Sequence, residues 1–373
     1  MLYPGGVALA VFLTLLLLSK RNKTIADKIL AGWLIAIAVH LLLFYFWKAG
    51  LYPQLLGAGL PFPLIHGPFL YLYTLALTRG KVSWVSAITH LLPFSACVIY
   101  LIPFFSLPTT EKIYVFQHQG VGYEVFNAVR SIATTSSGIL YVTLSTIALR
   151  RHRRSILQQF SSTDRINLRW LQYLIYWLAG IWIFVIFGND DLVYAAAVLF
   201  VLFIGFFGIR QVGIFITPTG GNPKDNEQPM LTTETESSGD EISERRKYQK
   251  SGLSTAHSEV LHRNLTFVMT TEKPFRESEL SLAELARRLN TQPNYLSQVI
   301  NEREGKNFYD YVNALRIEEF KRLAASPESR KFTLLALAQE CGFNSKSSFN
   351  RHFKKVTGKS PSEFIDTVPE TVN

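Results

Sequence analysis

A short stretch near the C-terminus carries hydrogen-bond donors of the kinds that contact DNA. Phe349 and Phe353 stand four residues apart, as expected on the buried side of a helix. The other positions of this stretch are polar or basic: Lys346, Ser347, Asn350, Arg351, Lys354 and Lys355. Arginine and asparagine can pair bidentately with base edges, and lysine can neutralise phosphates. A helix of this composition therefore suits the DNA major groove.

A preceding helix and a tight turn would position this reading helix. The apolar residues before it recur at three- and four-residue spacing, which predicts one buried face: Leu334, Leu337, Ala338 and Cys341. Gly342 follows directly, where a turn requires a positive φ or a close approach of the backbone. Residues 333–357 are therefore predicted to form a helix-turn-helix unit.

A second copy of this pattern lies about 50 residues earlier. Ser281 can cap a helix whose Glu284 reaches back in a capping box, and Pro293 suits the first turn of the next helix. The exposed side of that next helix is expected to carry uncharged polar residues: Asn294, Ser297, Gln298 and Asn301. Asn and Gln can pair with adenine. Residues 281–304 are therefore the predicted first helix-turn-helix unit.

Two further helices belong to the predicted domain over 254–373. A lead-in helix over 254–271 would bury four apolar residues: Val260, Leu261, Leu265 and Val268. Asn307 can cap a linker helix over 308–325, which joins the two units. An internal duplication joined by one helix would hold two reading helices at a fixed separation, and successive major grooves lie about 34 Å apart. One chain can then reach both grooves, and homodimer formation stays open.

Residues 1–217 contain long apolar runs instead. The runs fall at about 1–18, 29–47, 62–78, 85–105, 126–149, 168–187 and 192–216. Most of them are long enough, at about 1.5 Å per residue, to cross a hydrocarbon core of about 30 Å. We therefore expect an all-α chain, with a transmembrane bundle of about seven helices followed by the DNA-binding domain. Because the first run is short and the fifth is polar, six spans remain an alternative.

The charges between these runs predict the orientation of the bundle. The first run is uncharged and precedes the basic residues Lys20, Arg21 and Lys23, the reverse of the order in a cleaved signal peptide. With the N-terminus outside, 13 Lys and Arg residues lie on the inner side and three on the outer side, in accord with the positive-inside rule. Seven spans then deliver residue 218 onward to the cytoplasm, where DNA is.

The distribution of charge restricts how the chain can bind DNA. Residues 1–217 hold 16 Lys and Arg against 6 Asp and Glu, whereas residues 218–373 hold 22 of each. The net charge of +10 therefore comes from the first part, and DNA binding must depend on a local patch. Residues 218–253 are rich in Pro, Gly, Ser, Thr and acidic residues, which predicts a disordered acidic linker.

A second class of function is a multi-span transporter or enzyme with an accessory DNA-binding domain. That class requires intramembrane acids, bases or nucleophiles in convergent positions. The sequence has no HExxH, GxSxG, P-loop or paired-acid motif and no metal-ligand spacing. His40, His66 and His90 lie in or beside apolar runs, where a packing role is the expected one. No catalytic residue, metal site or cofactor is predicted.

Residues 255–366 resemble the AraC/XylS family of bacterial transcription regulators. The pattern A-x-x-C-G-F-x-[ST]-x-S-x-F-x-R-x-F-K-K-x-x-G-x-[ST]-P-x-x-[FY] runs from Ala338 to Phe364 without a gap. The resemblance implies a seven-helix domain with two helix-turn-helix units. It implies base contacts from Asn294, Ser297 and Gln298 on the first reading helix, and from Lys346, Ser347, Asn350 and Arg351 on the second. It implies phosphate contacts from Lys354 and Lys355.

The resemblance has further consequences for the first reading helix and for location. Gln298 stands where many relatives have Arg or Lys, so the first reading helix is expected to add less affinity. The β-barrel that binds sugars in soluble members is absent, so arabinose-like effectors are not inferred. The layout is similar to that of membrane-anchored relatives, which implies the bacterial inner membrane. The implied partners are double-stranded DNA, the lipid bilayer and an unidentified signal ligand or partner protein.

Overall fold

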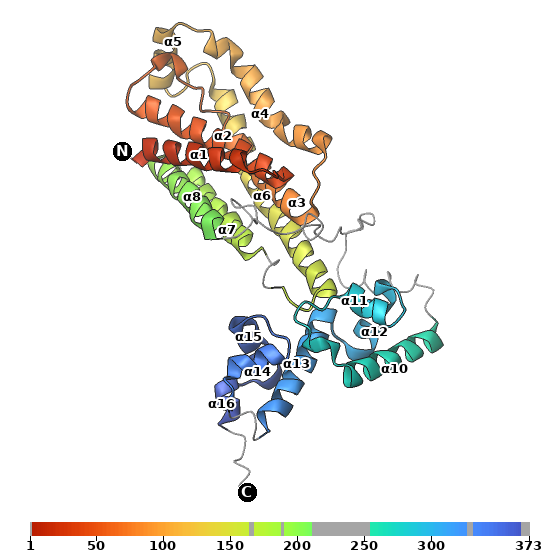
Figure 1. Cartoon of the computed structure of the whole chain (residues 1–373). Helices are drawn as coiled ribbons and strands as arrows, with labels where there is room; N and C mark the ends of the chain where they lie inside the picture. The colour runs from red at the N-terminus through yellow and green to blue at the C-terminus, as the bar shows by residue number, and fades with distance from the viewer. Residues whose placement is uncertain (1, 164–167, 188–189, 211–253, 327–330, 367–373) are drawn as a thin grey trace. The chain divides into compact units, whose positions relative to one another are not determined.

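The computed structural model describes residues 2–163, 168–187, 190–210, 254–326 and 331–366 (Figure 1). Within these ranges every regular element is a helix, and one isolated antiparallel bridge joins Phe160 to Ser281. The predicted all-α class is confirmed. The contacts divide the described chain into two units, one of 2–150 with 168–210 and one of 151–163 with 254–366. The predicted linker at 218–253 lies outside the described residues.

The first unit is built from long apolar helices. Their bounds are α1 Leu2–Ser19, α2 Ile25–Lys48, α3 Pro63–Arg79, α4 Trp84–Phe105, α5 Thr109–Gln117, α6 Glu124–Gln159, α7 Arg169–Ile186 and α8 Asp190–Arg210, with a short 3₁₀ turn η1 at Pro53–Leu55. Six of these helices are long and apolar enough to cross a membrane: α1, α2, α4, α6, α7 and α8. The remaining predicted span, the third run at 62–78, corresponds to α3, which has 17 residues and contains Pro68.

The larger core of the first unit lies among α1, α2, α3, α7 and α8 (Figure 1). Trp33 of α2 is fully buried, and its ring contacts the rings of Phe69 and Phe200. The outward sides of the same helices expose large apolar residues, such as Leu15, Ile35 and Leu202. A helix that is apolar on both its packed and its exposed sides is typical of a membrane environment.

Buried and half-buried polar side chains of the first unit form a chain across three helices. Trp33 Nε1 lies 3.3 Å from His66 Nδ1, and His66 Nε2 lies 3.0 Å from His40 Nδ1. Tyr194 Oη of α8 lies 2.8 Å from His40 Nε2. These contacts satisfy both imidazole rings, as buried polar groups require, and they agree with the packing role expected for His40 and His66. Among the described residues no group of His, Cys, Asp and Glu could hold a metal ion.

Among the described residues of 254–366, the second unit contains seven α-helices. They are α10 Thr255–Thr271, α11 Leu282–Arg288, α12 Pro293–Glu304, α13 Phe308–Ala324, α14 Leu334–Glu340, α15 Lys346–Thr357 and α16 Pro361–Ile365, with a 3₁₀ turn η2 at Pro274–Arg276. Two apolar cores pack against α13, one on each half of the helix. Phe308 and Val312 belong to the core with α10, α11 and α12, whereas Ile317 and Phe320 belong to the core with α14 and α15. The α13 helix is therefore the common support of both helix-turn-helix units.

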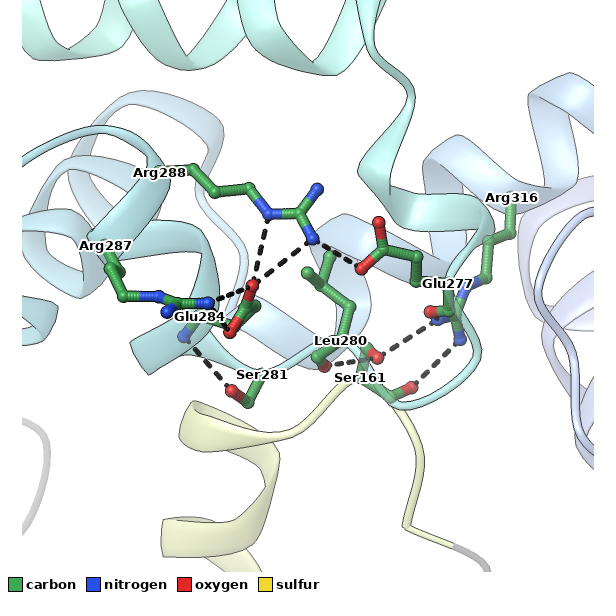
Figure 2. Close-up of polar contacts among 8 residues, drawn as sticks. All are labelled: Ser161, Glu277, Leu280, Ser281, Glu284, Arg287, Arg288 and Arg316. Atoms are coloured by element: carbon green, nitrogen blue, oxygen red, sulfur yellow. Dashed lines mark hydrogen bonds and ion pairs between the residues drawn. The ribbon is translucent and has the colours of Figure 1, made fainter.

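The structure differs from the predictions at one helix cap and at one buried position of this unit. Ser281 caps α11 by accepting the Glu284 N–H at 3.2 Å, but the reciprocal half of the capping box is missing. The Glu284 carboxylate instead binds Arg287 at 2.9 Å and Arg288 at 3.3 Å, because charged guanidinium donors compete well with a backbone amide (Figure 2). Val260, predicted to be buried, is 46% exposed, and Met269 takes its place in the core.

Candidate DNA-binding surface

The two helix-turn-helix units share one turn geometry. In the first, Asn290 has φ 49°, and the Thr291 amide donates to the Ala286 carbonyl. In the second, Gly342 has φ 96°, and the Phe343 amide donates to the Ala338 carbonyl. A Cβ at Gly342 would lie 2.6 Å from the Phe275 carbonyl oxygen, so glycine is required there for both φ and space, as the sequence predicted.

The α15 helix is fixed by its two ends and by its buried face. Ser345 caps it by accepting the Ser348 amide at 3.2 Å, and Gly358 ends it in the left-handed region at φ 75°. The Phe349 and Phe353 rings pack on the Phe320 ring of α13, with centroids 4.7 Å and 5.5 Å away. This aromatic anchor determines which side of α15 faces outward.

The outward side of α15 carries every residue predicted for it. Six side chains are exposed: Lys346, Ser347, Asn350, Arg351, Lys354 and Lys355. Four of them are cations, on a helix of 12 residues that contains no acid. The α15 surface therefore combines bidentate donors with point charges along one exposed face, which is the chemistry needed for bases and phosphates.

The Tyr309 hydroxyl connects Arg351 to the domain interior. Arg351 Nη2 donates to Tyr309 Oη at 2.8 Å, and the same oxygen lies 2.8 Å from His352 Nε2. Burial and then the Arg351 charge lower the pKa of His352 to about 4, so its ring is neutral at pH 7. A neutral ring nitrogen can accept the tyrosine proton while the tyrosine oxygen accepts from Arg351. Tyr309 is thus a positioning residue that the sequence reasoning missed.

The α12 surface is poorer in reading groups than predicted. Asn294 is exposed and Ser297 is partly exposed, but Gln298 is only 6% exposed, and its amide donates to Glu302 at 2.9 Å. The predicted outward placement of Gln298 is therefore wrong. The α12 helix packs against α10, α11 and α13 at once, so its exposed arc is narrow. The spacing of apolar residues in the sequence predicts one buried face, so it could not reveal that three helices pack against α12.

A buried carboxylate in α13 ties the two halves of the domain together. Glu319 is 6% exposed and forms ion pairs with Lys273 at 3.1 Å, with Arg322 at 2.9 Å and with Arg276. Arg322, followed by Arg276 and Lys273, lowers the pKa of Glu319 to about 2, against the opposing effect of burial. The sequence signal was an acid directly beside the inward-facing Phe320, and it was overlooked.

Known proteins share this part of the chain. Residues 285–367 match the family described as "Helix-turn-helix domain". Two HTH-type transcriptional regulators of Bacillus subtilis, YtdP and YobQ, are each 34% identical over 88 and 89 residues, which is 24% of this chain. The arabinose operon regulatory protein of Escherichia coli is 29% identical over 97 residues, or 26% of this chain. The C-terminal domain is an AraC-type helix-turn-helix domain.

The matches to the AraC-type domain leave most of each protein uncompared. This chain spans 11% of the length of YtdP, 36% of YobQ and 32% of the arabinose operon regulatory protein. By their names these relatives are transcriptional regulators, not enzymes. The several long apolar helices that precede the AraC-type domain are consistent with membrane anchoring.

Proposed function

We propose that this protein is a membrane-anchored transcription regulator that binds specific DNA sites through α12 and α15. The observation that carries the proposal is the exposed α15 face with its six polar side chains. In this proposal Lys346, Ser347, Asn350 and Arg351 contact bases, with Asn294 and Ser297 of α12 adding a second contact region. Lys354 and Lys355 contact phosphates.

The test is DNA selection with the full chain in lipid nanodiscs. We expect the wild-type chain to enrich a sequence from a random duplex library and Arg351→Ala to weaken that duplex by roughly 1–3 kcal/mol. Arg263→Ala is the matched control, since it removes the same charge from the exposed side of α10. If Arg351→Ala lowers the affinity for selected and random duplexes equally, Arg351 does not have its assigned role in reading bases.

We infer further that the chain crosses the inner membrane seven times, with the N-terminus outside and the AraC-type domain in the cytoplasm. The α3 helix supports this count, because its 17 residues lie at the lower limit of about 17–25 for a spanning helix. Reporter fusions test the orientation. A fusion after residue 373 that is active only in the periplasm would reject the regulator proposal, since DNA is absent there.

A cavity in the first unit supports a response to a small ligand. It has a volume of about 370 Å³, and its lining includes the apolar residues Leu101, Phe104 and Phe126 and the cation Arg130. The Arg130 Nε is buried, and no described residue accepts its hydrogen bond. A pocket of this size with one cation suits an anion with an apolar body. Decanoate should therefore bind to the chain in nanodiscs more tightly than decanol does, and Arg130→Gln should abolish that difference in affinity.

A further inference from the structure

The chain after α6 lies within the AraC-type domain, although it belongs to the loop that joins two membrane-type helices. Residues 151–163 share the compact unit of 254–366. Ser161 is 1% exposed there and Thr163 is 8% exposed. We use the name docking segment for residues 160–162. Figure 2 draws Ser161 among its partners Leu280 and Arg316.

Ser161 commits all of its polar groups to the domain. Its amide and its hydroxyl both donate to the Leu280 carbonyl, at 3.2 Å and 2.6 Å (Figure 2). Its carbonyl accepts from Asn313 Nδ2 at 3.0 Å and from Arg316 Nη1 at 3.3 Å. Its hydroxyl oxygen also accepts from Arg316 Nη2 at 3.1 Å. A buried serine with every donor and acceptor paired is a built contact and not a chance approach of two surfaces.

The docking segment also completes the surroundings of a buried cation. Arg316 is 1% exposed, and burial lowers its pKa to about 10, so it stays charged at neutral pH. Its Nε donates to the Phe275 carbonyl at 2.6 Å, and Nη2 donates to the Glu277 carbonyl at 2.8 Å. Nη1 donates to Asn313 Oδ1 at 3.3 Å. An arginine has five N–H donors, and Ser161 accepts from two of them. Withdrawal of Ser161 would leave a buried guanidinium short of partners, which is costly.

The neighbours of Ser161 extend the contact to both helix-turn-helix units. Phe160 forms the antiparallel bridge with Ser281, the N-cap residue of α11. Asn344 lies in the turn between α14 and α15, and its Nδ2 donates to the Ser162 hydroxyl at 3.2 Å. Three successive residues thus touch the first helix-turn-helix unit, the common helix α13 and the second helix-turn-helix unit.

We propose that the docking segment couples the membrane-type helices to DNA binding by holding the two helix-turn-helix units in one relative arrangement. The inference rests on the proposed DNA-binding function. A displacement of the α6 end withdraws residues 160–162, exposes Arg316 and lets α12 and α15 move independently. A site that spans two grooves then loses affinity because the domain is no longer preorganised, whereas a site that contacts one reading helix is unaffected.

The first test uses the full chain in nanodiscs with Ser161→Arg, which brings a like charge against Arg316. The matched control is Ser155→Arg, which adds the same charge to a partly exposed position in the last turns of α6. We expect faster amide hydrogen exchange in 160–162 and 275–281 with Ser161→Arg alone. Affinity for the selected duplex should fall about fivefold or more, and affinity for the same duplex with one half scrambled should not change. If hydrogen exchange shows that the docking segment has come away but the affinity for the selected duplex is unchanged, the coupling is rejected.

The second test fixes the segment in place. Phe160→Cys with Ser281→Cys places two cysteines across an antiparallel bridge, where a disulfide is geometrically allowed. The native Cys97 and Cys341 are buried and therefore do not compete for this disulfide. The oxidised chain should bind the selected duplex at least as tightly as wild type, and adding the Ser161→Arg substitution to it should no longer weaken binding. A persistent loss would reject the coupling. A wild-type chain that selects no duplex would reject the proposed function instead, while protection of Ser161 from exchange would still decide whether the segment docks.

Discussion

The two helix-turn-helix units have the same scaffold and different surfaces. In each unit a seven-residue helix capped by a hydroxyl residue, Ser281 or Thr333, precedes a turn with positive φ. A 12-residue helix follows, and it ends at a left-handed glycine, Gly305 or Gly358. The outer side of α15 has four exposed cations, whereas the predicted reading face of α12 offers Asn294 and parts of Ser297 and Asn301. The backbone geometry is repeated, whereas the surface chemistry differs.

This difference suggests a division of labour between the units. The second helix-turn-helix unit supplies the charge that attracts phosphates, and Tyr309 positions its Arg351. The first helix-turn-helix unit is bridged to the docking segment through Ser281, at its capped end. The second helix-turn-helix unit is thus equipped mainly for affinity, and the first for contact with the docking segment.

The largest expected effect separates the two turns. Gly342→Ala places a Cβ 2.6 Å and 2.8 Å from the carbonyl oxygens of Phe275 and Arg276, at φ 96°. Because backbone atoms cannot yield cheaply, we expect a loss of roughly 3 kcal/mol or more of domain stability. Asn290→Ala is the matched change, and it should cost only about 1 kcal/mol. Hydrogen exchange of α11 and α14 in the full chain measures both, and equal costs would show that the two turns are not differently constrained.

Sequence reasoning reached the repeated scaffold because local signals determine it. Hydroxyl caps, Pro293, Gly342 and the Phe349–Phe353 pair each act within a few residues of their place in the chain. One error arose where tertiary packing decides, because Gln298 is buried by the three helices around α12. A second error is local, because Glu284 binds Arg287 and Arg288 of its own helix instead of forming its predicted cap. Ser161 meets Arg316 across 155 residues, and no local pattern signals such a contact.

The next effect concerns the connection between the halves of the domain. Glu319→Gln removes the charge that binds Lys273, Arg276 and Arg322, and we expect a loss of about 2 kcal/mol at pH 7. The folded pKa of Glu319 is lowered from 4.5 to about 2, so its stabilisation is complete above about pH 4.5 and disappears as the pH falls through 2. The difference between wild type and Glu319→Gln should shrink in that window. A difference that is constant with pH would contradict the role of the carboxylate charge.

A smaller effect compares the reading helices directly. Asn350 on α15 and Asn294 on α12 are both exposed, and each can lose an adenine-type contact on mutation to Ala. We expect Asn350→Ala to weaken the selected duplex by roughly 1–2 kcal/mol and Asn294→Ala by about 1 kcal/mol, each at a different base position. Competition binding with single-base variants of the duplex measures both. If Asn294→Ala leaves every position unchanged, α12 does not read DNA, and the second unit acts alone.

The smallest effect distinguishes two adjacent lysines of α15. Lys355 already forms an ion pair with Asp310 at 2.7 Å, whereas the structure gives Lys354 no ion pair within 4 Å among the described residues. Lys354→Ala should therefore weaken selected and random duplexes alike, and it should lower the slope of log affinity against log salt by about one. Lys355→Ala should change that slope less, because part of its charge is balanced in the free domain. Titrations at several salt concentrations decide between them, and a larger change for Lys355→Ala would mean that DNA displaces the Asp310 pair and takes Lys355 as its main phosphate contact.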